Sequence, residues 1–283
     1  MRMRWEHTKF LARFASAMLD LVDLLLLRRG IPADDREIAF RRIDGNPAST
    51  VIYFLPWCTP FVFAHRAGFT PLDFLACYEM PTGIVSSEPA LCVQAMLGLV
   101  SDAERLLKQR DVKAGDAVIV GLSVGTYPAT YLANRVGARL FSVASADRGD
   151  LAIWQSPATR IIKNRAVKRG LSLRHYSRAL SGSHPAENLT GIAPNSVFMI
   201  GNSDPYVPPD RKRGLMRAIE TYVHDANVIE LDAGHFKTLM VSGRYQRRLL
   251  GKDCARRTWR LPVLFWRAAS DSHSAELPSL NVS

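Results

Sequence analysis

The sequence predicts an α/β fold, in which a mostly parallel central sheet carries helices on both faces. Short apolar runs rich in β-branched residues alternate along the chain with longer segments of helical spacing. Several of these runs are apolar at every position, which is typical of strands covered on both faces. The chain has 283 residues, of which 47% are hydrophobic. It is therefore long enough for one large domain with a substantial core.

The first predicted element is an amphipathic helix within residues 1–30. Its apolar side chains recur at helical spacing, and Gly30 is placed to end it; they are Leu11, Phe14, Met18, Leu21, Val22 and Leu25. Charged residues interrupt the apolar stretch and no small-residue cleavage site follows, so the pattern does not predict a signal peptide. Two roles remain open: packing against the domain or a second copy, and peripheral contact with a membrane surface.

The body of the domain is predicted over residues 31–252, as strands that alternate with helices. We expect strands at residues 37–41 and in runs that start at Val51, Gly83, Ala117, Arg139, Ser196 and Ala226. We expect helices at residues 89–110, from residue 126 to about Ala138, at residues 209–223, and after the last strand.

Two further segments depart from this alternation. Residues 148–195 separate two core strands and have no strand pattern of their own, which predicts an inserted helical lid. Residues 253–283 are predicted to form a carboxyl-terminal extension that is first basic and then polar, with a loose tail.

The positive charge of the chain is concentrated in two places. There are 37 Lys and Arg against 26 Asp and Glu, a formal net charge of +11. Residues 148–178 and residues 244–267 each hold eight basic side chains and a single Asp. A solvated basic surface and attraction of an anionic substrate, such as the phosphates of an acyl-CoA or a lipid headgroup, both remain open. Nucleic-acid binding is not predicted, because no nucleic-acid motif or recognition helix accompanies the charge.

The four cysteines have no metal-ligand spacing, so the sequence predicts no metal site. A chain of this length needs no disulfide framework to fold. We therefore expect reduced thiols and a cytoplasmic location.

A pentapeptide at residues 121–125 provides the main chemical signal. Gly121-Leu122-Ser123-Val124-Gly125 follows a predicted strand and precedes a predicted helix. A strand-to-helix turn of this kind is so sharp that small residues must flank the serine, whose hydroxyl is then exposed at the edge of the sheet. A serine becomes a nucleophile only when a base removes its proton and a third group orients that base. Asp204 and His235 each follow a later predicted strand, and parallel strands end at a common edge.

These three turns, GLSVG from Gly121, GNSDPYVP from Gly201 and DAGHF from Asp232, give the chain its resemblance to the α/β-hydrolase superfamily. The resemblance covers about residues 51–250. It implies that Ser123 is the nucleophile, that His235 is the general base and then the acid, and that Asp204 orients the imidazole. In the resembled family the position of Asp232 belongs to the turn that delivers the histidine, so Asp204 is preferred as the acid. Each residue also has a structural alternative: a turn serine, a helix N-cap and a structural histidine.

The resemblance further implies hydrolysis of a carboxylic ester or thioester, through an acyl-serine intermediate and without metal or organic cofactor. Acyl transfer on the same triad, and a catalytically silent fold that binds a small ligand, remain as alternatives. Neither the substrate-binding residues nor the oligomeric state is predicted.

The oxyanion hole is where the sequence departs from the resembled family. Such a hole needs two backbone N–H groups, one from the residue after the nucleophile, here Val124, and one from the loop after the strand that starts at Val51. Family members commonly place a His-Gly pair in that loop, whereas this chain has Leu55-Pro56-Trp57-Cys58-Thr59-Pro60. Since Pro56 has no N–H, Trp57 or Cys58 must donate, and Trp57 is the predicted donor.

Overall fold

The computed structural model describes residues 14–22, 24–25, 31, 33–62 and 73–249. Residues 1–246 form one compact unit and residues 247–283 a second. The predicted carboxyl-terminal extension, residues 253–283, lies outside the described residues.

A seven-stranded sheet forms the centre of this unit, and its strand order is β1-β3-β2-β4-β5-β6-β7. The strands are β1 Arg41–Asp44, β2 Val51–Phe54, β3 Ala76–Glu79, β4 Val118–Leu122, β5 Arg139–Val143, β6 Val197–Gly201 and β7 Asn227–Leu231. Among the strands that the structure describes, only the edge strand β1 pairs antiparallel, with β3, and the other pairs of neighbours are parallel. The mostly parallel sheet predicted from the sequence is therefore confirmed.

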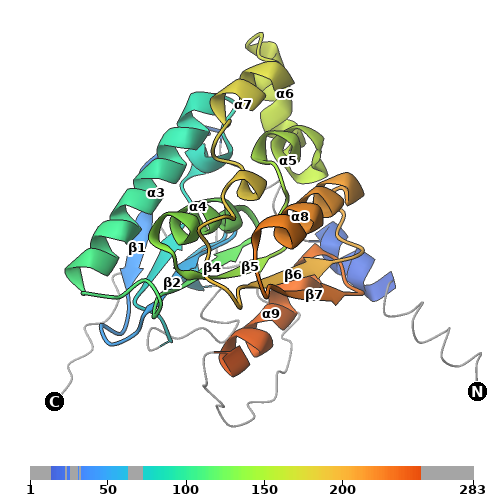
Figure 1. Cartoon of the computed structure of the whole chain (residues 1–283). Coiled ribbons are helices and arrows are strands. Elements are labelled where there is room, and N and C mark those ends of the chain that lie inside the picture. The colour runs from blue at the N-terminus through green and yellow to red at the C-terminus, as the bar shows by residue number, and fades with distance from the viewer. Residues whose placement is uncertain (1–13, 23, 26–30, 32, 63–72, 250–283) are drawn as a thin grey trace, which may run out of the picture. The chain divides into compact units, whose positions relative to one another are not determined.

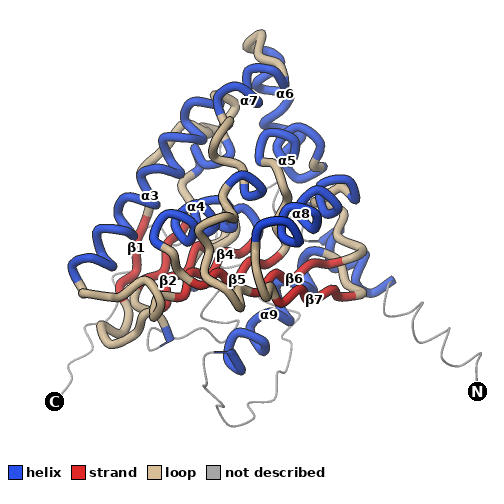
Figure 2. The backbone as a smooth tube through the Cα atoms, in the orientation of Figure 1, coloured by secondary structure: helices blue, strands red, loops and turns tan. Residues whose placement is uncertain are grey.

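Helices cover both faces of the sheet (Figure 1). On one face lie α3 Pro89–Gln109, α4 Thr126–Val136 and α8 Pro209–Tyr222, and on the other lies α9 His235–Leu249. The buried hydroxyl of Tyr53 in β2 donates to Gln246 Oε1 of α9 at 3.0 Å, which ties that helix to the sheet. Figure 2 shows the strands enclosed between these helices. Accordingly β2 and β6 are buried along their whole length, as their continuous apolar runs predict.

The sequence sets the limits of the main helices. Proline opens both α3 and α8, at Pro89 and Pro209, where the first turn of a helix needs no N–H. Gly137, with φ of +69°, ends α4 in the left-handed conformation that glycine adopts without strain. These helices match their predicted ranges to within about two residues at each end.

The strand predicted near Gly83 is wrong, because residues Thr82–Val85 form the short 3-10 helix η2. The N–H of Gly83 donates to Glu37 O at 2.7 Å, and a β-carbon at Gly83 would lie 2.7 Å from the same oxygen. Gly83 is therefore bonded to the backbone of a residue that is not in a strand, and the segment is not part of the sheet. The strand in this part of the sheet is instead β3, which is formed by the residues just before this segment. The first strand also lies later than predicted, starting at Arg41 rather than at residue 37.

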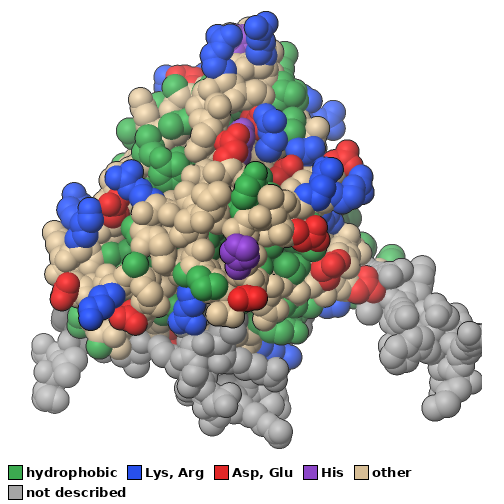
Figure 3. Space-filling model, in the orientation of Figure 1, with side chains coloured by type: hydrophobic (Ala, Val, Ile, Leu, Met, Phe, Trp, Pro, Cys, Tyr) green, Lys and Arg blue, Asp and Glu red, His purple; other side chains and the backbone are tan. Residues whose placement is uncertain are grey.

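The segment from residue 148 to residue 195, called the insert below, is helical as predicted. It contains α5 Gly149–Gln155, α6 Arg160–Lys168 and α7 Leu173–Ala179, with the short 3-10 helices η4 Pro157–Thr159 and η5 Pro185–Glu187. Lys and Arg side chains gather at the tip formed by α6 and α7 (Figure 3). Among all the helices described, none is both long enough and apolar enough to cross a membrane.

Candidate active site

The turn after β4 holds Ser123 in a strained conformation. Its φ is +53°, in the left-handed region that residues with a side chain rarely adopt. A β-carbon at Gly121 would lie 2.6 Å from both Thr126 Cα and the Ala129 side chain, and one at Gly125 would lie 2.6 Å from Leu55 O. Both glycines are therefore required by close backbone packing, which explains their spacing on either side of the serine.

Three strand ends bring the predicted polar side chains together. Ser123 Oγ lies 2.9 Å from His235 Nε2, and His235 Nδ1 lies 2.7 Å from Asp204 Oδ2. His235 and Asp204 are both 5% exposed, and Ser123 is half-buried. The sequence separates these residues by up to 112 positions, yet they form one continuous chain of hydrogen bonds. A serine, a histidine and a carboxylate in this order can pass a proton from the hydroxyl to the imidazole.

The backbone of its own turn fixes the Asp204 carboxylate. Its Oδ1 atom accepts hydrogen bonds from the N–H groups of Tyr206 at 2.8 Å and Val207 at 3.2 Å. Oδ2 is thereby directed toward the imidazole of His235. The ring of Tyr206 also packs on the ring of His235, with centroids 4.7 Å apart. The rival carboxylate, Asp232, is exposed.

Lys212 of α8 supports the same turn, a role that no sequence pattern predicts. Its Nζ donates to Gly201 O and Asn202 O, both at 2.9 Å, and to Asp204 O at 3.4 Å. Burial lowers the pKa of Lys212 from its usual value, although the charge of Asp204 acts in the opposite direction. A lysine within the sequence Pro209-Asp210-Arg211-Lys212-Arg213 is typical of an exposed helix face, so the charged neighbours of Lys212 predict solvent exposure and not burial.

The amino-terminal helix, residues 14–22 and 24–25, holds the turn that carries His235. Ser16 Oγ accepts a hydrogen bond from the Gly234 N–H at 2.9 Å, and Asp20 Oδ1 accepts one from the Phe236 N–H at 3.0 Å. These are N–H groups at the start of α9, which have no acceptor within their own helix. Asp20 O also accepts from the hydroxyl of Tyr206 at 2.8 Å.

Both polar residues of this contact are buried, since Ser16 and Asp20 are each 4% exposed. A β-carbon at Gly234 would overlap the Asp20 carboxylate, so the glycine permits the close approach of the two segments. The spacing of Ser16 and Asp20, four residues apart, is the signal that could have identified them as one helix face. In an amphipathic pattern, however, polar positions are ordinarily assigned to solvent.

The predicted oxyanion residues lie in the two turns that contact each other. Val124 follows the serine and is half-buried, and Trp57 is 5% exposed in the turn after β2. Within that turn Thr59 N–H donates to Pro56 O at 3.2 Å, and Cys58 has φ of +56°. Burial raises the pKa of the Cys58 thiol to about 12, so the thiol stays protonated at neutral pH.

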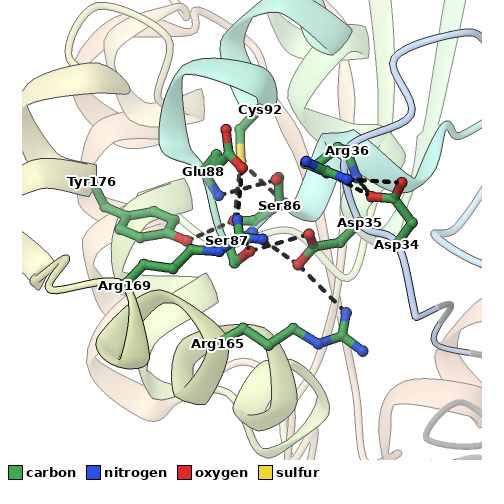
Figure 4. A network of polar contacts seen from close by, with 10 residues as sticks. All are labelled: Asp34, Asp35, Arg36, Ser86, Ser87, Glu88, Cys92, Arg165, Arg169 and Tyr176. Atoms are coloured by element: carbon green, nitrogen blue, oxygen red, sulfur yellow. Dashed lines mark hydrogen bonds and ion pairs between the residues drawn. The ribbon is translucent and has the colours of Figure 1, made fainter.

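A second polar network attaches the insert to the start of α3 (Figure 4). The Asp35 carboxylate, 2% exposed, accepts hydrogen bonds from the N–H and the hydroxyl of Ser87, both at 3.1 Å. Arg165 of α6 lies 3.5 Å from the same carboxylate. Arg169 donates to Ser87 Oγ at 2.8 Å and to Glu88 Oε1 at 2.7 Å.

Tyr176 of α7 completes this attachment by donating its hydroxyl to Ser86 O at 2.6 Å. Elsewhere in the insert, Arg148 pairs with Asp150 at 2.6 Å. Three guanidinium groups of the basic segment 148–178, those of Arg148, Arg165 and Arg169, therefore have protein carboxylates as partners. In the part of the chain that the structure describes, no group of three or more His, Cys, Asp or Glu side chains could hold a metal ion.

No family model and no curated protein matches the sequence. The structure, in contrast, is similar to that of oligopeptidase B from Leishmania major, with a TM-score of 0.50 and 11% identity over 75% of this chain and 34% of that one. It is also similar to an enol-lactonase from Burkholderia xenovorans, with a TM-score of 0.45 and 16% identity over 76% of this chain and 95% of that one. An alpha/beta hydrolase from a Medee basin deep-sea metagenome library is 14% identical over 79% of this chain and 96% of that one, with a TM-score of 0.46. The chain has the α/β-hydrolase fold, in agreement with the resemblance found in its sequence.

Proposed function

We propose that this protein is a serine hydrolase that cleaves a carboxylic ester or thioester through an acyl intermediate on Ser123. The observation that carries the proposal is the hydrogen-bonded chain from Ser123 Oγ through His235 to Asp204. Ser123 is half-buried at a strained turn between strand and helix, and a turn of this kind presents a serine hydroxyl at the edge of the sheet. Strain at one side chain persists only where the surrounding structure enforces it, and such positions cluster at active sites.

The first half of the reaction forms the acyl-enzyme. Ser123 Oγ attacks the substrate carbonyl carbon while His235 Nε2 takes the hydroxyl proton, and the carbonyl π electrons move to oxygen. When the tetrahedral intermediate collapses, the bond to the leaving oxygen or sulfur breaks and His235 returns the proton to it. Asp204 holds His235 in the tautomer that has Nε2 free to accept, and stabilises the imidazolium.

In the second half, water replaces the serine as nucleophile. His235 takes a proton from the water, the new C–O bond forms, and collapse of the second intermediate releases the acid and returns the proton to Ser123. The oxyanion of both intermediates would accept hydrogen bonds from the N–H groups of Val124 and Trp57. Removal of one such donor typically slows an enzyme by about 10²–10³-fold.

We further propose that the insert serves as a lid over the substrate. The pairing of Arg165 with Asp35 and of Arg169 with Glu88 neutralises part of the positive charge of the insert. We therefore favour a neutral acyl ester over an anionic one as the substrate.

Labelling with a fluorophosphonate tests the activated serine. The native protein should take up one phosphonyl group, and Ser123→Ala should take up none. Ser101→Ala, which removes an exposed serine of α3, is the matched control and should label like the native protein. Absence of labelling in the native protein, or labelling that survives in Ser123→Ala, would reject the proposal.

Two carboxylate variants test the identity of the acid. Asp204→Asn should lower kcat by on the order of 10⁴-fold, because it leaves the imidazole in the wrong tautomer. Asp232→Asn should stay near the native rate, because that side chain is exposed. A large loss in the second variant alone would assign the acid to Asp232.

Substrate class can be determined with p-nitrophenyl esters and acyl-CoA thioesters of graded chain length, assayed at low and high salt. Preference for neutral esters without a salt effect agrees with the proposal, whereas preference for CoA thioesters that weakens with salt would favour an anionic substrate. Addition of an acceptor alcohol distinguishes hydrolysis from acyl transfer, since a transferase forms a new ester in place of the free acid.

A further inference from the structure

The amino-terminal helix is inverted with respect to an ordinary amphipathic helix. Its buried residues are polar, Ser16 and Asp20, and both are engaged with the histidine turn. The opposite side carries a stripe of large apolar side chains that are 45–58% exposed; this stripe, called the outer face below, consists of Phe14, Met18, Leu21, Val22 and Leu25. Steps of three and four residues place these five side chains on one side of the helix.

The outer face is unusually apolar for a protein surface that is exposed to water. Isolated exposed apolar residues are normal, but a contiguous stripe on one helix indicates a docking surface. Full burial of one such side chain is worth roughly 1.5–3 kcal/mol. A contact that buries all five side chains would therefore gain several times that free energy, before the entropic cost of ordering the contact is subtracted. The inner hydrogen bonds fix which side of the helix faces outward, so the helix cannot rotate to bury its apolar side against the domain.

Charge in the flanking sequence indicates what covers this face. Four basic residues come before residue 14 in the sequence, Arg2, Arg4, Lys9 and Arg13, with Glu6 as the one acidic residue among them; Arg28 and Arg29 come soon after residue 25. An apolar stripe between cationic flanks is the pattern of helices that lie in a lipid interface. Each Lys or Arg near an anionic membrane surface contributes about 1 kcal/mol of attraction.

The same charges disfavour two other occupants. A second copy of this chain would bring an identical set of cationic flanks close to the first, and like charges repel. The carboxyl-terminal segment from Arg256 to Arg267 is itself basic, with four Arg and no acidic residue, so it would meet the same repulsion.

We propose that the outer face docks on a bilayer surface that contains anionic phospholipid, with its five apolar side chains inserted at the headgroup boundary. This goes beyond the hydrolase chemistry, and it does not require Ser123. The docked helix would keep its inner hydrogen bonds, so the histidine turn would be held in place while the protein is on the membrane.

The experiment is sedimentation of the full-length chain with vesicles of phosphatidylcholine alone, or of equal parts of phosphatidylcholine and phosphatidylglycerol. Ser123→Ala is used as the background, so that no lipid is hydrolysed. We expect binding to the anionic vesicles, weak binding to the neutral ones, and a decrease on addition of salt.

A triple variant identifies the surface responsible. Met18→Gln, Leu21→Gln and Leu25→Gln together should weaken binding to anionic vesicles by at least about tenfold, since they remove most of the apolar insertion. The matched control substitutes three exposed apolar residues on other helices, Leu97→Gln, Val167→Gln and Tyr222→Gln, and should bind like the background protein. All the substituted side chains are exposed, so circular dichroism should show both proteins folded.

Four results would overturn the proposal: no binding to either vesicle, equal binding to both, unchanged binding of the triple variant, or a loss of dimer mass in light scattering of that variant. The last would identify a second copy as the occupant. Hydrolysis of a water-soluble p-nitrophenyl ester, measured in the same variants with Ser123 restored, reports on the proposed function separately. If the ester were not hydrolysed, the proposed function would fail while the vesicle-binding result would still stand.

Discussion

Two buried carboxylates from the segment before the sheet perform similar tasks at different places. Asp20 accepts the Phe236 N–H beside His235, and Asp35 accepts the Ser87 N–H just ahead of α3. Asp20 is 4% exposed and Asp35 is 2% exposed. They differ in what they hold, because Asp20 fixes the backbone of the histidine turn, whereas Asp35 also contacts Arg165 of the insert.

This difference separates two functions of the amino-terminal segment. Removal of Asp20 should change the position of the general base and thus the rate of the chemical step. Removal of Asp35 should loosen the insert and thus change stability, with little effect on the chemistry of a small substrate. Substitutions at four positions, Gly234, Asp20, Asp35 and Arg169, test this separation.

Gly234→Ala should have the largest effect, because the added β-carbon would overlap the Asp20 carboxylate and displace either the helix or the histidine turn. A displacement of about 1 Å at a catalytic group can cost on the order of 10²-fold in rate, so we expect at least that loss in kcat. Gly115→Ala is the control, since nothing lies within 4 Å of its added β-carbon. Native activity in Gly234→Ala would show that the helix does not constrain the turn.

Asp20→Ala should lower kcat by about 10–100-fold with little change in KM, because it removes the acceptor for the Phe236 N–H and leaves His235 less well placed. Asp20→Asn keeps an oxygen that can accept the same hydrogen bond and should recover most of the rate. Steady-state kinetics on a soluble ester measures both values. If Asn and Ala at this position were equally slow, the charge rather than the hydrogen bond would be the important property.

Asp35→Ala should destabilise the fold by about 1–3 kcal/mol, because it leaves buried donors of Ser87 without their acceptor. For a domain of this size each kcal/mol lowers Tm by about 2–4 °C. Thermal unfolding followed by circular dichroism gives the shift, and kcat on a small soluble ester should stay near the native value. A loss of kcat as large as that of Asp20→Ala would erase the distinction between the two carboxylates.

Arg169→Ala should have the smallest effect, below about 1 kcal/mol, because Arg169 and Glu88 are 41% and 43% exposed and water screens their attraction. High salt should reduce the difference between the variant and the native protein further. Denaturant unfolding at two salt concentrations measures this difference in the free energy of unfolding. A cost above that of Asp35→Ala would mean that the exposed pair, not the buried carboxylate, holds the insert.

Much of the fold and of the candidate site could be predicted from local sequence patterns. The buried run of β4 and the pentapeptide around Ser123 are local signals, and the neighbouring ends of parallel strands predict that Asp204 and His235 approach it. The strand at Gly83 was mispredicted because a backbone contact with Glu37, distant in sequence, decides its conformation. Ser16, Asp20 and Lys212 were missed because each is a polar residue in an amphipathic or charged stretch, where burial depends on a tertiary partner.

The most direct test of the acyl-serine account is mass spectrometry of the enzyme quenched in acid during turnover of a p-nitrophenyl ester. We predict that the peptide containing Ser123 gains the mass of the acyl group. The same peptide should remain unmodified in His235→Ala, in which no base removes the proton. An acyl mass on another residue, or turnover with no acylated peptide at any quench time, would contradict the account.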